Sequence, residues 1–332
     1  MIRTEDAYLA GIVDGDGCIH VTGAEHGHYL VVYAAFRNGS IDPLIDFLNH
    51  YGNCSYSKAK RVIQWNAYGE RGLSVLRTIR PYLVHKQRTA DVVLENYSTD
   101  NRHGREAAWE ASRKITNALR DAPPSVDKYV GSQTAVTPED AAYAAGFFDS
   151  EGCVYIAHGR TKKLMGTGKP RCSPYSLAVS VAQGDCRPLV WLADRFGGNV
   201  YRRNKTCCRS GYFHVWSLNG QKALNFLRAV APHVILKKSE VDLVLGQWSF
   251  AGNDGGLDYL AENRALRARR DSMKSALRDL KKAHRGAAAY CRLGNEEQDR
   301  DTPPETQEGS VRMTPEPGAS LTSWSAPCPC GP

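Results

Sequence analysis

The chain of 332 residues is long enough for two domains of ordinary size whose cores need no disulfide bonds. Its formal net charge is +8, from 43 Lys and Arg against 35 Asp and Glu, which fits a polyanionic partner and equally fits a merely basic soluble protein. No cysteine pair has the C-x-x-C spacing of a zinc site, no apolar run could span a bilayer, and the start of the chain resembles neither a signal peptide nor a presequence. We therefore expect a soluble, intracellular protein in a reducing compartment, in the cytoplasm or within an organelle.

The first 121 residues are expected to form one α+β unit. It begins with a helix through Tyr8, Leu9 and Ile12 that ends near Gly15. The pattern then predicts two strands, an amphipathic helix, two more strands, and a helix that Pro81 interrupts before helical character resumes. These elements cover residues 18–21, 29–36, 43–51, 54–60, 62–68, 73–79 and 89–97.

The second half of the chain repeats this order. Matching residues are separated by an offset that grows in steps: Asp16 matches Glu151 at 135, Pro43 matches Pro188 at 145, and Trp65 matches Trp216 at 151. Such steps indicate insertions in the second copy, one in its first hairpin and one near residues 204–211, where loops tolerate them. Because the two tryptophans pair across the repeat, we interpret them as core anchors under their sheets.

The repeat predicts the domain organisation. The segments are an N-terminal repeat at 1–121, a linker at 122–136, a C-terminal repeat at 137–256, a basic helix at 257–287 and a disordered tail at 288–332. The second repeat opens with Thr137 as a helix N-cap, followed by Pro138. The basic helix either extends a nucleic-acid contact or packs on the second repeat, and its charge does not decide between the two.

Two matching stretches, Leu9–Gly17 and Ala144–Gly152, carry the chemistry. Each is an apolar run that ends in two acidic residues and a glycine. Small side chains recur at every fourth position along both helices, at Ala7, Gly11, Gly15, Ala142, Gly146 and Ser150. Such ridges let two helix backbones approach closely, so we expect the helices to pack together and bring Asp16 and Glu151 to one place.

These two carboxylates predict a cation site. A carboxylate at a helix C-terminus faces the negative end of the helix dipole, and a second carboxylate alongside makes its position less favourable still. Hard oxygen ligands suit Mg²⁺, which shares phosphate oxygens and can activate water for phosphodiester cleavage. The alternative for either motif alone is a solvated turn with acidic residues. Two copies in the same repeat context favour the metal site.

The two motifs resemble those of the LAGLIDADG homing endonucleases, in the double-motif form in which one chain supplies both halves of a pseudo-dimer. The first motif matches closely, with Val13 for isoleucine and Gly15 for alanine, whereas the second departs further, with Ala144, Phe147, Phe148, Ser150 and Glu151 at substituted positions. The resemblance implies two tandem αββαββα repeats with pseudo-twofold symmetry, whose antiparallel sheets form a saddle over DNA. It also implies a monomeric, site-specific endonuclease that makes a metal-dependent double-strand break by hydrolysis in a long, imperfectly palindromic site.

The resemblance further implies roles for individual residues. The implied catalytic residues are Asp16, Glu151, Lys86, Lys237, Asn38 and Gln183, and the implied metal ligands are Asp16, Glu151 and the main-chain carbonyls of Gly15 and Ser150. The metal would be Mg²⁺ or Mn²⁺. The two lysines would lie near the scissile phosphate, where they stabilise negative charge or orient water. The asparagine and glutamine, matched by the offset of 145 at the end of the second strand of each repeat, would position water.

Double-stranded DNA would be read by the strands and hairpins, because a two-stranded β-ribbon fits the major groove. The candidate contacts are basic or amide side chains on predicted strands or hairpins, namely His20, His28, Arg37, Lys58, Lys60, Arg61, Gln64, Arg160, Lys162, Lys163, Lys169, Arg171, Arg202, Arg203, Lys205, Arg209 and His214. Any one of them is equally consistent with an ordinary exposed residue, and their clustering is the informative part.

The competing function is a nucleic-acid binder of the same fold that does not cut. Such a protein would be either a maturase that binds its host intron RNA or a DNA-binding relic. Because a carboxylate is retained at the end of both motifs, the sequence favours the endonuclease.

Overall fold

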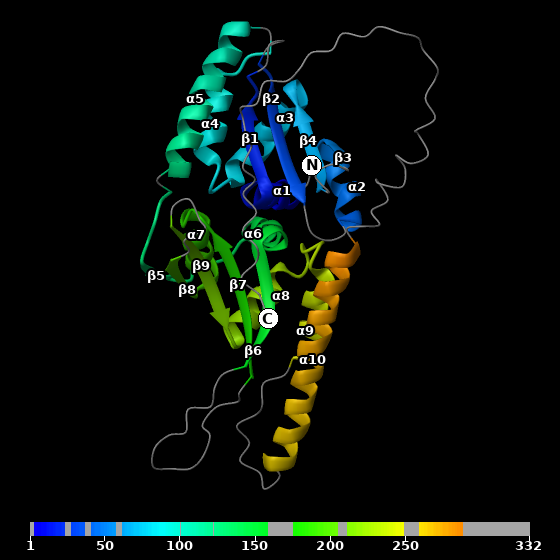
Figure 1. Cartoon of the computed structure of the whole chain (residues 1–332). Helices are drawn as coiled ribbons and strands as arrows, with labels where there is room; N and C mark the ends of the chain where they lie inside the picture. Colours follow the sequence, from blue (N-terminus) through cyan, green and yellow to red (C-terminus); the bar gives the residue numbers. More distant parts are fainter. Residues whose placement is uncertain are drawn as a thin grey trace, which may run out of the picture.

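The structure is a computed structural model that describes residues 3–23, 28–36, 41–57, 62–99, 101–121, 123–158, 175–204, 211–248 and 259–287. The tail at 288–332, which the sequence predicts to be disordered, lies outside the described residues. Figure 1 shows two units stacked on each other, with the helices α1 and α6 between them.

The first unit is a four-stranded antiparallel sheet with helices on one face. Its elements are α1 (Arg3–Asp16), β1 (Gly17–Val21), β2 (Leu30–Phe36), α2 (Asp42–Tyr51), β3 (Asn53–Ser57), β4 (Val62–Tyr68), α3 (Gly69–Ile79), the 3₁₀ helix η1 (Arg80–Tyr82), α4 (Gln87–Asn96) and α5 (Arg102–Asp121). The strand order is β1-β2-β4-β3. Along β4, buried residues such as Trp65 alternate with half-exposed ones such as Gln64, because only one face of the sheet is covered.

The second unit repeats this arrangement. Its elements are α6 (Pro138–Glu151), β6 (Gly152–His158), β7 (Tyr175–Gln183), α7 (Arg187–Phe196), β8 (Asn199–Asn204), β9 (Tyr212–Asn219), α8 (Gln221–Val230), α9 (Lys238–Gln247) and α10 (Tyr259–Ala287). Thr137 caps α6 as predicted: its side chain accepts from the amide of Asp140, whose carboxylate accepts from the amide of Thr137. The α+β fold with two tandem αββαββα repeats is therefore confirmed.

The segment between the repeats is more than a linker. Residues 122–136 contain a strand, β5 (Lys128–Val130), which pairs with β8 and makes the second sheet five-stranded in the order β5-β8-β9-β7-β6. The Tyr129 hydroxyl donates to Asp194 at 2.6 Å. This short edge strand forms through tertiary pairing, which the turn-forming residues around it concealed in the sequence.

Each sheet is anchored by the predicted tryptophan. Trp65 and Trp216 are completely buried. Their indole N–H groups donate to the carbonyls of Leu48 at 2.8 Å and Gly197 at 2.9 Å, at the C-terminal ends of α2 and α7. A buried indole needs such a partner, so each tryptophan fixes the helix that follows the second strand onto its sheet.

The motif helices meet backbone to backbone. A Cβ atom on Gly11 would lie 2.2 Å from the carbonyl oxygen of Tyr143, and one on Gly146 would lie 2.1 Å from that of Tyr8. Only a residue without a side chain fits at either position. The predicted packing of the two small-residue ridges is thus confirmed, and it joins the units through one continuous core.

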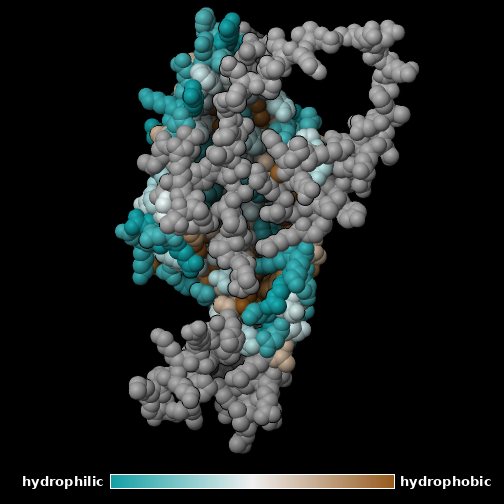
Figure 2. All heavy atoms as spheres, viewed as in Figure 1, coloured by the Kyte–Doolittle hydropathy of each residue, from teal (hydrophilic) through white to brown (hydrophobic). Residues whose placement is uncertain are grey.

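The basic helix α10 packs on the second unit, against α9 and β6. Met273 and Leu277 are buried there, the Arg270 guanidinium stacks over Trp248 at 4.8 Å, and Lys281 donates to the carbonyl of Val154 at 2.7 Å. Figure 2 shows that the outward-facing residues of this helix that the structure describes are predominantly hydrophilic. Within the described ranges, no helix combines the length and the apolar character needed to cross a bilayer.

The glycine contact gives a direct test of the interface. Gly11→Ala is expected to lower the free energy of unfolding by about 3 kcal/mol or more, because the new methyl group would overlap main-chain atoms that cannot move independently. The matched control is Gly246→Ala in α9, where a Cβ meets nothing within 4 Å. This control should leave stability unchanged or raise it by about 0.5 kcal/mol in urea unfolding. Equal stabilities for the two variants would contradict the close backbone contact.

Candidate active site

The C-terminal ends of α1 and α6 lie against each other. A Cβ atom on Gly15 would lie 2.4 Å from Cβ of Ser150 and 3.4 Å from Cγ of Glu151. Asp16 and Glu151 are the last residues of the two helices. The structure therefore brings the two motif ends together, as the small-residue ridges predict.

The environment of Asp16 disfavours its ionised form. Burial raises the pKa of this carboxyl from its usual 3.8 to about 6, while the nearby ammonium groups of Lys237 and Lys86 lower it in part. The opposing effect of both lysines shows that they share the electrostatic environment of Asp16. One centre at the junction of the units thus contains one predicted carboxylate and both predicted lysines, next to Glu151.

Two acids that sequence reasoning did not single out organise this centre. Asp14 and Asp149 are buried. The carboxylate of Asp14 accepts from the main-chain amides of Val84, His85 and Lys86 at 2.7, 2.9 and 2.9 Å, and that of Asp149 accepts from those of Ile235, Leu236 and Lys237 at 2.7, 3.0 and 2.9 Å. Each acid therefore binds the N-terminal approach to α4 or α9, where helix amides favour a negative charge.

The sequence did contain a signal for this role. Both motifs carry an acid two residues before the predicted metal ligand, and these acids match at the same offset of 135 as Asp16 and Glu151. An acid that recurs in both copies at an apolar helix end is expected to be buried and therefore to need hydrogen-bond donors. The partner is a loop that ends in the predicted lysine, and we call it the lysine loop. It comprises residues 84–86 for Asp14 and residues 235–237 for Asp149, far away in the sequence.

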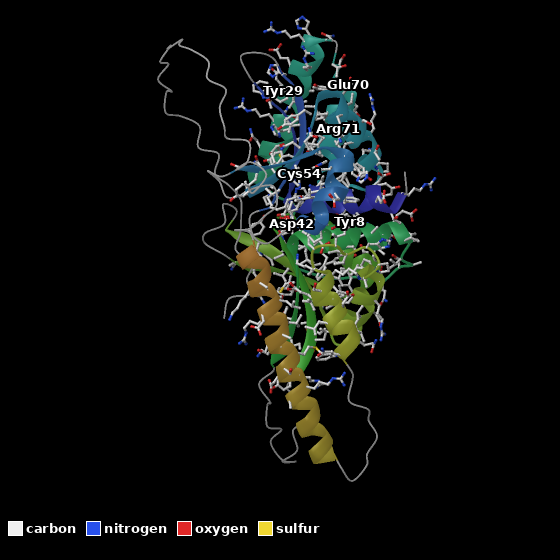
Figure 3. All side chains as sticks on the ribbon, turned by 90° about the vertical axis from the view of Figure 1, so that its right-hand side faces the viewer. Tyr8, Tyr29, Asp42, Cys54, Glu70 and Arg71 are labelled. Atoms are coloured by element: carbon white, nitrogen blue, oxygen red, sulfur yellow. The ribbon has the colours of Figure 1, made fainter. Side chains whose placement is uncertain are left out.

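Each of these buried acids is also bonded by the other unit. The hydroxyl of Tyr8 donates to Asp149 at 2.7 Å, and that of Tyr143 donates to Asp14 at 2.8 Å. Burial first, and then the adjacent carboxylate, raise the pKa of both tyrosines well above the usual value, so both remain protonated donors. Figure 3 shows Tyr8 where the two units meet. The two bonds cross the interface in opposite directions and obey the pseudo-twofold symmetry.

The lysines are held at the ends of the motif helices. The ammonium of Lys86 donates to the carbonyl of Asp14 at 2.7 Å. The ammonium of Lys237 donates to the carbonyl of Phe148 at 2.9 Å and also to that of Asp149. A cation at a helix C-terminus interacts favourably with the dipole, so these contacts partly offset the unfavourable position of the two terminal carboxylates.

The oxygen donors at the ends of α1 and α6 suit a metal ion whose remaining ligands come from water and a bound substrate. Among the described residues, no three His, Cys, Asp or Glu side chains are grouped so that they could hold an ion by themselves. Two carboxylates with adjacent main-chain carbonyls fit Mg²⁺, which keeps several waters and takes further oxygens from phosphate groups. The predicted ligands Asp16, Glu151, Gly15 and Ser150 are therefore chemically compatible with a metal that binds together with DNA.

The predicted match between Asn38 and Gln183 needs correction. Asn38 lies outside the described residues. Gly17 pairs with Ala34 in the first sheet, whereas Gly152 pairs with Val181 in the second, so β7 aligns with β2 at an offset of 147 rather than 145. Gln183 then corresponds to Phe36 and is not the counterpart of Asn38. The offset of 145 holds for the helices α2 and α7, because the second copy has two residues fewer between strand and helix.

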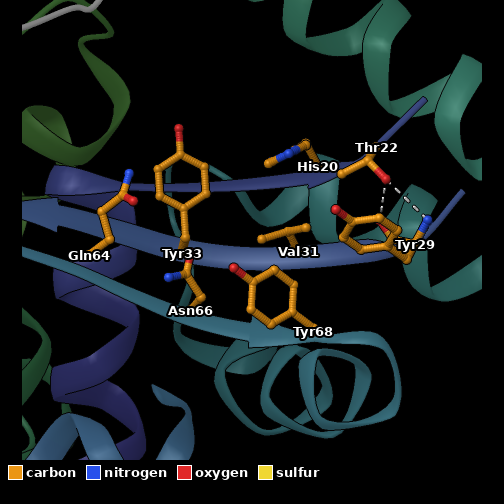
Figure 4. A pocket seen from close by; sticks show the side chains of 8 residues that line it. All are labelled: His20, Thr22, Tyr29, Val31, Tyr33, Gln64, Asn66 and Tyr68. Atoms are coloured by element: carbon orange, nitrogen blue, oxygen red, sulfur yellow. Dashed lines mark hydrogen bonds between the residues drawn. The ribbon is translucent and has the colours of Figure 1, made fainter. Parts of the chain in front are cut away.

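Two of the predicted DNA contacts lie on the open face of the first sheet. His20 and Gln64 line a hollow of about 210 Å³ together with Thr22, Tyr29, Val31, Tyr33, Asn66 and Tyr68. Figure 4 shows these side chains standing on one face of β1, β2 and β4. The polar and aromatic lining makes this face suitable for groove contacts. His28 is nearby, with its Nδ1 atom 2.7 Å from the carbonyl oxygen of Thr22 and its ring 5.3 Å from that of Trp109.

His214 is a correction to the DNA-contact prediction. His214 is completely buried, with its ring nitrogens 2.9 Å from the carbonyl oxygen of Gly184 and 3.0 Å from the hydroxyl of Ser125. It lies two residues before the core tryptophan of β9 and therefore shares its covered face. Arg202 pairs with His214 across the strands and forms an ion pair with Asp127 at 2.9 Å. The His214 side chain thus belongs to the covered side of the sheet, whereas the Arg202 side chain is exposed and its DNA contact stays a prediction.

The remaining DNA candidates are distributed as follows. Arg203 occupies the alternate position on β8, next to the Tyr201 ring at 5.2 Å. The other candidates lie outside the described residues; they are Arg37, Lys58, Lys60, Arg61, Arg160, Lys162, Lys163, Lys169, Arg171, Lys205 and Arg209.

The raised pKa of Asp16 predicts a pH-dependent gain of stability on neutralisation. The metal-free Asp16→Asn protein is expected to be about 2 to 3 kcal/mol more stable than the parent at pH 8. Because the carboxyl titrates near pH 6 when folded and near its usual 3.8 when unfolded, the difference should shrink below pH 6, fall below about 1 kcal/mol at pH 4 and vanish only below pH 3.8.

Urea unfolding in the presence of a chelator at pH 8, 6 and 4 measures this effect. The control is Glu95→Gln at an exposed position of α4, which should change stability by less than about 0.5 kcal/mol at each pH. An Asp16→Asn protein that is less stable than the parent at pH 8 would show that the carboxylate is not disfavoured there.

Comparison with known proteins identifies the fold. No protein-family model matches the chain, and no curated protein matches it in sequence. Among solved structures, the I-LtrWI LAGLIDADG homing endonuclease bound to target DNA superposes with a TM-score of 0.52 at 12% identity, covering 84% of this chain and 96% of that one. I-SmaMI bound to an uncleaved DNA target in the presence of calcium ions superposes with a TM-score of 0.50 at 12% identity, covering 83% of this chain and 97% of that one. The chain therefore has the fold of the LAGLIDADG homing endonucleases.

Proposed function

We propose that this protein is a site-specific DNA endonuclease that makes a double-strand break by metal-dependent hydrolysis of phosphodiesters. The observation that carries the proposal is the meeting of Asp16, Glu151, Lys86 and Lys237 where two pseudo-symmetric units join. Both copies retain the acid and the lysine, which a pair of cutting sites requires. A binder that does not cut would need neither the unfavourable carboxylates nor the ammonium groups next to them.

The architecture supports double-stranded DNA as the substrate. Each unit contains an antiparallel sheet, and in the first unit one face of the sheet is hollowed and lined by polar and aromatic side chains. The structural neighbours I-LtrWI and I-SmaMI were both solved bound to DNA. Because the two units are similar but not identical, the proposed site is long and only imperfectly palindromic, and one chain suffices to cover it.

The chemistry is divided between the metal and the chain. Asp16 and Glu151 would hold Mg²⁺ or Mn²⁺, with the main-chain carbonyls of Gly15 and Ser150 as further ligands, and the bound ion would supply an activated water and neutralise phosphate charge. The ammonium groups of the two lysines stabilise the negative charge that develops on the phosphate. Asp14 and Asp149 fix the lysine loops, so the ammonium groups are in position before DNA arrives.

Selection of cleaved sites from a randomised DNA library with Mg²⁺ tests activity and target together. We expect the parental protein to yield a single family of sites. On that DNA, Asp16→Asn and Glu151→Gln should each reduce cleavage by about a thousandfold or more while binding in a gel-shift assay persists. The control variant Glu95→Gln should cut at the parental rate. A parental protein that binds selected DNA but cuts it with neither Mg²⁺ nor Mn²⁺ would contradict the proposal.

The lysines give a second test of the proposal. Lys86→Ala and Lys237→Ala are each expected to slow cutting about tenfold to a thousandfold, and to slow different DNA strands, because each lysine belongs to a different unit. The measurement is the rate of nicking of each end-labelled strand. Lys222→Ala, on the exposed side of α8, is the control and should leave both rates unchanged. Parental rates in both active-site variants would show that the ammonium groups take no part.

A further inference from the structure

The two lysine loops have the same design but differ in one side chain. Each loop donates three main-chain amides to a buried aspartate and presents its lysine to the end of a motif helix. The middle residue is His85 in the first loop and Leu236 in the second, at the offset of 151. This difference coincides with an additional contact to the first loop, from Arg187.

That contact comes from the start of α7 in the other unit. The Arg187 guanidinium donates to the carbonyl of His85 at 3.1 Å. The same guanidinium is held by the carboxylate of Asp185, with Nε at 3.1 and 3.0 Å from the two oxygens and Nη2 at 2.5 Å from Oδ2. Asp185 is 3% exposed and Arg187 is 32% exposed, so the carboxylate is shielded from water, and several hydrogen bonds fix the geometry of the pair.

The imidazole of His85 does not compete for Asp185. Its Nδ1 atom lies 3.8 Å from the carboxylate, beyond hydrogen-bond distance. Burial, and then the positive charges of Lys86 and Arg187, hold the pKa of His85 well below its usual value. The charge partner of Asp185 is therefore Arg187, and the guanidinium is free to bond the main chain of the loop.

We call the hydrogen bond from Arg187 to the carbonyl of His85 the brace of the first lysine loop. The residue that matches Arg187 in the first repeat cannot form such a bond to the second loop. The counterpart of Arg187 at the offset of 145 is Asp42, which likewise begins the helix α2. Figure 3 shows Asp42 on the first unit near the junction. A carboxylate has no N–H group, so Asp42 cannot donate to the carbonyl of Leu236. The asymmetry is thus determined by the identity of one residue in each repeat.

We propose that Asp185 and Arg187 are positioning residues for the Lys86 half of the active centre alone, so that the second unit sets the rate at which one DNA strand is cut. The inference rests on the proposed endonuclease function. Arg187 acts through the main chain next to Lys86, and a displacement of about 1 Å in a group that stabilises a transition state is enough to cost about a hundredfold in rate.

The test measures strand-specific nicking of a supercoiled plasmid that carries the site selected with the parental protein. Arg187→Gln and Asp185→Asn are each expected to slow one strand about tenfold to a hundredfold, and it should be the strand that Lys86→Ala slows. The strand that depends on Lys237 should be cut at the parental rate. Because the pair acts as one unit, the double variant should be no slower than the slower single variant.

A matched control separates positioning from a general loss of structure. Arg71 in α3 also donates to main-chain carbonyls, those of Asn49 at 2.9 Å and His50 at 3.3 Å, but it lies away from both loops. Arg71→Gln removes the same kind of bond and should leave the rates for both strands unchanged. Figure 3 labels this residue. Equal slowing of both strands in Arg187→Gln, slowing of the Lys237-dependent strand, or weakened DNA binding as the only defect would overturn the proposal.

A second measurement does not depend on cleavage. Amide hydrogen exchange in the free protein should become faster at residues 84–86 in Arg187→Gln and stay unchanged at residues 235–237. If the parental protein proves unable to cut DNA, this asymmetric change would still support the brace while the proposed function fails. Unchanged exchange at residues 84–86 would overturn the brace itself, whatever the activity.

Discussion

The close backbone contact between α1 and α6 is the constraint on which the rest of the structure depends. At Gly11 and Gly146 the helices are too close for any side chain. This distance places the two helix ends side by side, lets Tyr8 and Tyr143 reach the buried acids of the opposite unit, and puts both lysines near Asp16. A wider spacing would separate two ordinary α+β units, each with half of a centre.

The four acids of the two motifs have opposite roles. Asp14 and Asp149 each accept hydrogen bonds from three main-chain amides and a tyrosine, and these bonds offset the cost of burying a carboxylate. Asp16 has a raised pKa because burial disfavours its charge, and only cations relieve that cost. The first pair fixes the two lysine loops, whereas the ionised form of Asp16 lowers the stability of the fold, as is common for functional groups. On α1, two residues of separation thus distinguish Asp14, whose buried carboxylate is fully hydrogen-bonded, from Asp16, whose charge is disfavoured.

The sequence predicted the architecture because the repeat made each signal appear twice. The helix packing, the core tryptophans and the meeting of the motif ends all followed from spacing. What it missed depends on tertiary pairing: β5 forms only against β8, and the role of Asp14 requires a loop some seventy residues away. Arg187 is a single residue whose counterpart is Asp42, so the repeat gave no second signal for it.

The error at Gln183 arose because an offset taken from helices was applied to strands, and only the strand pairing reveals the difference. His214 could have been excluded from its distance to Trp216, since alternate residues on a strand share a face.

The central claim is that the ends of α1 and α6 form one metal centre for cutting DNA. Its most direct test is anomalous diffraction from Mn²⁺ in crystals of the protein bound to its selected DNA. The account predicts an anomalous peak within coordination distance of a carboxylate oxygen of Asp16 or Glu151 and of a phosphate oxygen of the DNA. Manganese bound only elsewhere, with both carboxylates turned away from the phosphates, would contradict it.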